Sequence, residues 1–142
     1  MLRIVLDTVV FVRALINPKS RCGRLLNEYS GRFQIVVSEP TVRELLEVIS
    51  RPELTAKYRG LAEANIRRII DLLAQAETVQ LDRVLEIVRD PKDNIFVATA
   101  LMSRADYLIS EDKDLLVLGN SIGVPVIDTV TFIKLFESQV QV

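Results

Sequence analysis

The sequence predicts a three-layer α/β/α sandwich with a mostly parallel central sheet. Short apolar runs alternate along the chain with longer segments whose apolar residues recur at helical spacing. The runs are apolar at consecutive positions, as is typical of strands buried on both faces of a sheet. No linker, repeat or low-complexity segment divides the 142 residues. We therefore interpret residues 1–142 as a single domain, long enough to bury a sizeable core.

Helix-breaking and capping residues set the boundaries in the first half of the chain. Asn17-Pro18 and Arg51-Pro52 each end a helical segment, and Ser38 is a good N-cap with Pro40 in the first turn. The core stripe expected on the helix after Ser38 is Val42, Leu45, Leu46 and Ile49. We expect strands at 2–6 and 33–37, and helices at 9–15, 20–30, 39–50, 53–59 and 61–76.

The second half repeats the alternation. A brief strand at 78–81 precedes a helix opened by Asp90-Pro91-Lys92-Asp93. That helix is apolar all round from Ile95 to Met102, so it should be deeply buried. We then expect strands at 106–109 and 124–127, a helix after Ser110 that ends before Gly119-Asn120, and a last helix from Thr129 to about 137.

Composition excludes several kinds of chemistry. The chain has no histidine and one cysteine, so triads built on histidine, a disulfide within the chain and the usual zinc sites are not available. The net charge is −1, so any nucleic-acid binding must be local. There is no apolar run long enough for a membrane span, and we expect a cytoplasmic protein. If the protein is an enzyme, carboxylates, hydroxyls and lysines must carry the chemistry, and a hard metal bound by oxygen is the favoured cofactor.

Four acids from distant segments are candidates for that chemistry. Asp7, Asp93 and Asp112 each lie where a strand or loop enters a helix, and such points gather along one edge of a parallel sheet. Each could instead be a helix cap or a first-turn acid that offsets the helix dipole. Glu44 lies well off the core stripe of its helix and could be a solvated surface residue. Carboxylates gathered at about 5 Å repel by roughly 3 kcal/mol per pair, which a divalent cation would offset.

The motifs around these acids resemble those of PIN domains, in particular the branch related to VapC toxins. The matching segments are Leu6-Asp7-Thr8-Val9, the Glu44 helix that begins Ser38-Glu39-Pro40-Thr41, Asp93-Asn94-Ile95-Phe96 before the apolar helix, and Ser110-Glu111-Asp112-Lys113-Asp114. Together they span nearly the whole chain in the family's order. One position departs from the pattern, because Val9 replaces the asparagine that usually supports the acids.

The resemblance implies a metal-dependent ribonuclease. On that basis Asp7, Asp93 and Asp112 would hold Mg²⁺ or Mn²⁺, and Glu44 would ligate the metal or orient a bound water. Thr8, Ser110 and Asp114 would support these acids. From their nearness to the acids in the sequence, Arg13, Lys92 and Lys113 are candidate contacts to RNA phosphates, and the alternative for each is a solvated surface charge. The resemblance also implies a cognate antitoxin and a homodimer as partners.

Two rival interpretations stay open. A phosphorylated receiver domain also has an Asp at a strand end, but it requires paired acids after the first strand, and Asp7 stands alone there. The second rival is a catalytically weak or inactive PIN-fold module that binds protein, and the valine at position 9 favours it.

Overall fold

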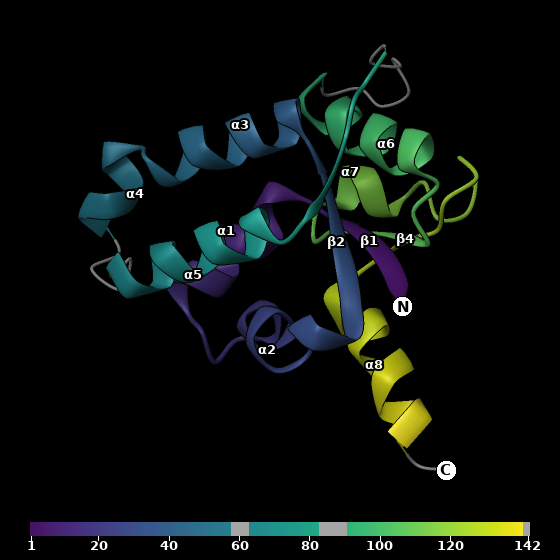
Figure 1. Cartoon of the computed structure of the whole chain (residues 1–142), viewed down its shortest axis with the longest axis horizontal. Coiled ribbons are helices and arrows are strands. Elements are labelled where there is room, and N and C mark those ends of the chain that lie inside the picture. The colour runs from purple at the N-terminus through teal and green to yellow at the C-terminus, as the bar shows by residue number, and fades with distance from the viewer. Residues whose placement is uncertain (58–62, 83–90, 141–142) are drawn as a thin grey trace.

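The protein is a parallel five-stranded sheet covered by helices on both faces, which confirms the predicted fold class (Figure 1). The computed structural model describes residues 1–57, 63–82 and 91–140; within these ranges, the side chains of residues 55, 57, 63–65, 91–93 and 139–140 are not described. The strands are β1 (Leu2–Leu6), β2 (Phe33–Ser38), β3 (Glu77–Val79), β4 (Tyr107–Ile109) and β5 (Val126–Ile127), in the spatial order β3-β2-β1-β4-β5, with every neighbouring pair parallel.

The helices connect successive strands and differ from the predicted ranges by a few residues at their ends. They are α1 (Thr8–Ile16), α2 (Arg21–Glu28), α3 (Glu39–Ile49), α4 (Pro52–Lys57), α5 (Glu63–Ala74), α6 (Pro91–Ser103), α7 (Lys113–Leu116) and α8 (Thr129–Val140), with a short 3₁₀ turn η1 at Ser30–Arg32. The helix expected over 20–30 thus ends at Glu28. No helix among the described residues is long and apolar enough to cross a membrane.

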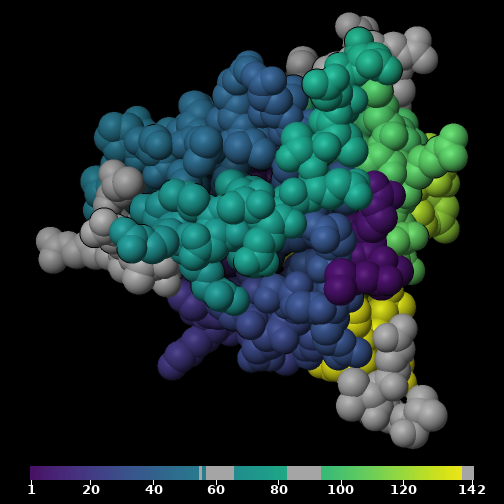
Figure 2. Space-filling model, viewed as in Figure 1, coloured from purple at the N-terminus to yellow at the C-terminus, as the bar shows by residue number. Residues whose placement is uncertain are grey.

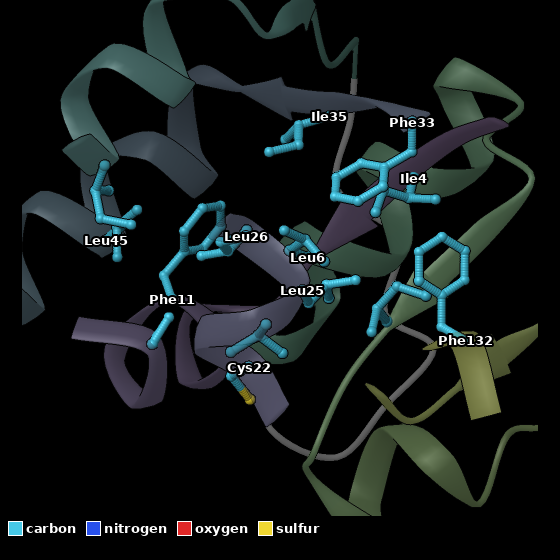
Figure 3. Close-up of a cluster of buried hydrophobic side chains, with 14 of the residues drawn as sticks. Ile4, Leu6, Phe11, Cys22, Leu25, Leu26, Phe33, Ile35, Leu45 and Phe132 are labelled. Atoms are coloured by element: carbon cyan, nitrogen blue, oxygen red, sulfur yellow. The ribbon is translucent and has the colours of Figure 1, made fainter. Parts of the chain in front are cut away.

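The strands are apolar at consecutive positions because both faces of the sheet are buried. Along β1, Ile4 and Leu6 pack into one core with α1, α2, α3, α5 and α8, whereas Val5 packs into a second core with α6 and α7. Successive side chains of a strand point to opposite faces, so this alternation creates the three layers. Figure 3 shows the first core, where Phe33 and Phe132 come together from β2 and α8.

One residue of the expected core stripe and one apolar residue of α5 lie at the surface. Leu46 on α3 is 42% exposed and Ile70 on α5 is 49% exposed. Both line an open apolar groove with Val42 and Leu73, between two helices that lie along one face of the molecule (Figure 2). On α3, helical periodicity predicted the buried face correctly, but Leu46 at its edge is exposed to solvent.

The carboxyl ends of the central strands meet at one edge of the sheet. Leu6 pairs with Ile109 in register, and the Asp7 backbone N–H donates to the Ile109 carbonyl at 3.1 Å. On the other side of β1, β2 ends in the buried Ser38, from which α3 starts. The residues that follow β1 and β4 are therefore brought together although they are a hundred positions apart in the sequence.

Candidate active site

Asp7 is the buried centre of the candidate site. It is only 3% exposed and is the N-cap of α1, where its Oδ1 accepts the backbone N–H of Val10 at 3.0 Å. Its Oδ2 accepts a short hydrogen bond from the Ser110 hydroxyl. The capping role that the sequence left open is thus real, and the two carboxylate oxygens, with about four lone-pair positions, still have room for a further ligand.

Burial disfavours the charge on Asp7. It raises the pKa of the Asp7 carboxyl from 3.8 to about 6; the bonds from Ser110 and from the Val10 and Glu111 backbone oppose this shift, and the charge of Asp112 adds to it. Among the residues whose side chains the structure describes, no lysine or arginine forms an ion pair with Asp7. A buried carboxylate without a cation is costly, so this position favours a bound positive charge.

Ser110 links Asp7 to Asp112. Besides donating to Asp7, the Ser110 hydroxyl accepts the backbone N–H of Asp112 at 2.9 Å, and Ser110 itself is fully buried. Asp112, not Ser110, is the N-cap of α7, and its Oδ1 accepts the backbone N–H of Asp114 at 2.9 Å. Ser110 therefore holds the loop after β4 against Asp7 and leaves the Asp112 carboxylate half-buried at the edge of the site.

Thr8 joins the site to α3. Its hydroxyl donates to Glu44 Oε2 at 2.5 Å, although the two residues are 36 positions apart. Glu44 is half-buried, which the helical wheel alone did not predict. It faces neither the core stripe nor open solvent, because α3 packs against α1 and this residue turns toward Thr8. The start of α3 is fixed where the Ser38 backbone N–H donates to Thr41 Oγ1 at 3.0 Å.

The remaining predicted residues have different positions. Lys92 and Asp93 lie in the first turn of α6, but their side chains are outside the described part of the structure, and so is Asp90. Asp114 and Lys113 are exposed at the start of α7. Arg13 is exposed on α1, with its Nη1 3.9 Å from Glu111 Oε2. Glu111 occupies a variable position of its motif, so sequence reasoning gave no signal for it.

Hydrogen bonds connect the described acids, but they do not form a complete metal cluster. Among the residues whose side chains are described, no group of three or more Cys, Asp or Glu side chains is placed to hold a metal ion. Asp7 and Asp112 are joined through Ser110, and Glu44 is joined to the residue after Asp7. The donor atoms offered here are carboxylate and hydroxyl oxygens, which are the ligands that Mg²⁺ and Mn²⁺ prefer.

The one cysteine does not offer an alternative nucleophile. Burial raises the pKa of the Cys22 thiol to about 11; the charges of Glu111 and Asp7 raise it further, and that of Arg13 opposes them. A thiol is reactive as its thiolate, so Cys22 is a core side chain at neutral pH (Figure 3).

Comparison with known proteins identifies the family. A sequence model of the PIN domain matches residues 3–114 of the chain. The chain belongs to the PIN domain family. An uncharacterized protein of Methanocaldococcus jannaschii is 31% identical over 122 residues, which are 82% of this chain and 75% of that protein. The match to the PIN domain model ends at Asp114, so it includes every acid of the candidate site.

Solved structures share the fold of this PIN domain at low sequence identity. VapBC2 from Rickettsia felis, bound to a DNA fragment from its promoter, is 14% identical with a TM-score of 0.55, over 89% of this chain and 98% of that one. DNA-bound VapBC from Salmonella typhimurium is 18% identical with a TM-score of 0.56, over 91% and 99%. PAE2754 from Pyrobaculum aerophilum is 15% identical with a TM-score of 0.56, over 96% and 90%. At these identities the likeness concerns the fold.

Proposed function

We propose that this protein is a Mg²⁺- or Mn²⁺-dependent endoribonuclease of the VapC type. The observation that carries the proposal is the buried Asp7 carboxylate. It has no basic partner among the described residues, it is tied through Ser110 to Asp112, and its neighbour Thr8 is tied to Glu44. PIN domains are generally nucleases, and this arrangement supplies the acidic site that such chemistry needs.

Asp7 and Asp112, with Asp93 from the start of α6, are the residues that would hold the metal. Glu44 would ligate it or hold the attacking water, and Asp114 would assist from the exposed edge. When bound, the ion lowers the pKa of a water and stabilises charge on the phosphate oxygens. Thr8 keeps the Glu44 carboxylate in place by donating to one of its oxygens, and Ser110 does the same for Asp7.

Cleavage of a labelled single-stranded RNA tests this function. We expect cutting with Mg²⁺ or Mn²⁺ and none with EDTA. Asp7→Asn should lower the rate at least a hundredfold, because the amide keeps the cap of α1 but loses the negative charge. Asp71→Asn is the matched control, since Asp71 is an exposed aspartate on α5 outside the site. Equal rates for Asp7→Asn and wild type, with both proteins folded, would contradict the proposal.

A non-catalytic PIN-fold module is the second candidate. Val9 favours it, because this residue is 39% exposed in the first turn of α1, where the family usually has a supporting asparagine. If no metal supports cutting and calorimetry detects no Mn²⁺ binding to the wild type, this second function is correct and the nuclease proposal is wrong.

We also propose that the protein has a cognate antitoxin and forms a homodimer. Support for the antitoxin comes from the two VapBC structures, in which the domain of similar fold is part of a complex. Light scattering of the purified chain alone, and after co-expression with the product of an adjacent small gene, measures both assemblies.

A further inference from the structure

Glu111 was not among the predicted acids, but it belongs to the loop that carries Ser110 and Asp112 of the candidate site. It is the residue between Ser110 and Asp112, and its side chain is only 12% exposed. Its backbone bonds to Asp7, whereas its side chain has other partners. Its Oε1 accepts the backbone N–H of Thr129 at 3.2 Å and also the Thr129 hydroxyl, while its Oε2 faces Arg13. The carboxylate therefore connects the loop after β4, the start of α8 and the exposed side of α1.

The start of α8 fixes the Glu111 carboxylate without help from Arg13. Thr129 is the first residue of α8 and is fully buried, so its N–H and O–H hold Oε1 in one position. The N-terminus of a helix stabilises negative charge. The Glu111 carboxylate is thus held in place independently of Arg13, and its second oxygen is a fixed point that faces the Arg13 guanidinium.

Arg13, in contrast, keeps most of its hydrogen-bonding capacity. Its side chain is 54% exposed, and the contact to Glu111 at 3.9 Å is too long for a hydrogen bond. Among the described residues, no other ion pair or side-chain hydrogen bond engages its guanidinium. Its donors are free for a ligand, and a guanidinium matches the geometry of a phosphate.

The position of Arg13 puts these donors beside the acids. Val9 and Arg13 are four residues apart and share the exposed face of α1, which starts at Thr8. Glu111 reaches Arg13 from the loop whose neighbouring residues, Ser110 and Asp112, belong to the site. The Arg13 guanidinium, 3.9 Å from Glu111, thus borders the loop that carries Ser110 and Asp112. A phosphodiester chain entering the site would bring a neighbouring phosphate to this side of α1.

We propose that Glu111 is a positioning residue that holds Arg13 at the edge of the acid site, where Arg13 binds a substrate phosphate next to the one that is cut. The inference rests on the proposed nuclease function and adds a substrate-binding subsite to it. Glu111 acts through Arg13 and does not touch the substrate.

A double-mutant cycle on RNA cleavage tests the pair. Arg13→Gln should raise KM about tenfold with little change in kcat, and should reduce the slope of log affinity against log salt by about 0.7, as expected for one lost phosphate contact on a single strand. Glu111→Gln keeps an acceptor for Thr129 but loses the charge that faces Arg13, so KM should rise about threefold. In the Arg13→Gln background, Glu111→Gln should have no further effect.

Matched variants separate this role from a structural one. Arg24→Gln removes a similarly exposed arginine, paired with Glu28 on α2, and should leave KM and the salt slope unchanged. Arg13→Lys retains the charge and should recover part of the lost affinity without any change in Glu111 or α8, so it tests the subsite even if Glu111→Gln does not fold. RNA binding followed by fluorescence anisotropy in EDTA gives the same comparison without cleavage.

Three results would overturn the inference. An equal effect of Glu111→Gln with and without Arg13 would show that Glu111 only supports α8. Tighter RNA binding by Glu111→Gln would show that its carboxylate competes with phosphate for Arg13. An unchanged KM in Arg13→Gln would remove the subsite. A wild-type protein that cuts no RNA in any metal overturns the proposed function instead, and is therefore distinguishable.

Discussion

At the scale of the residue, the buried Asp7 carboxylate lowers the stability of the metal-free folded protein. Its pKa is about 6 in the folded chain against 3.8 for an exposed aspartate, mainly because of burial. The folded state therefore binds more protons than the unfolded state between these values, and the stability of the metal-free protein falls as the pH rises through this window. A shift of this size corresponds to about 3 kcal/mol lost above pH 7.

It follows that Asp7→Asn should stabilise the metal-free protein while it abolishes activity. In EDTA at pH 7.5 we expect its midpoint of thermal unfolding to exceed that of the wild type by roughly 6–12 °C, since 1 kcal/mol shifts a chain of this size by about 2–4 °C. The difference should nearly vanish at pH 4, where the wild-type carboxyl is protonated. Calorimetric scans of both proteins at the two pH values measure this, and a less stable Asp7→Asn at pH 7.5 would refute it.

At the scale of the element, the junctions of strands with helices were largely predictable, because short-range chemistry determines them. Ser38 and Pro40 start α3, and Ser20 caps α2 by accepting the Gly23 backbone N–H at 3.2 Å. What could not be predicted depends on neighbours. Glu44 is half-buried only because α1 brings Thr8 to it, and Glu111 has its partners on α8 and α1. No periodicity within one element contains that information.

The first turn of α2 provides a prediction at this scale. A Cβ on Gly23 would collide with the backbone of Pro18, in the turn between α1 and α2. Gly23→Ala should therefore destabilise the protein by roughly 2 kcal/mol or more through displaced backbone, although alanine is the better helix former. Gly31→Ala is the control, since nothing lies within 4 Å of a Cβ there. Urea unfolding of the two variants compares them, and equal midpoints would contradict the prediction.

At the scale of the whole molecule, the proposed site can form only when the sheet is assembled. Asp7, Glu44 and Asp112 come from three segments, and what connects them is the parallel order of β2, β1 and β4. The order of acids and elements in the sequence was enough to predict the fold, since a parallel sheet gathers its carboxyl ends at one edge. The sequence could not show that Ser110 connects Asp7 to Asp112 or that Thr8 bonds to Glu44. These hydrogen bonds depend on side-chain positions in the folded state.

Because the unfolded chain cannot bring these acids together, a divalent ion should bind the folded state and stabilise the molecule as a whole. At a Mn²⁺ concentration of 100 times the dissociation constant, we expect about 2.7 kcal/mol of stabilisation, hence a rise of roughly 5–10 °C in the midpoint of thermal unfolding, and its reversal by EDTA. Asp7→Asn should show little of this rise, whereas Asp71→Asn should show all of it. A rise of equal size in Asp7→Asn would mean that the ion binds outside this edge of the sheet, and that the buried Asp7 carboxylate has a purely structural role.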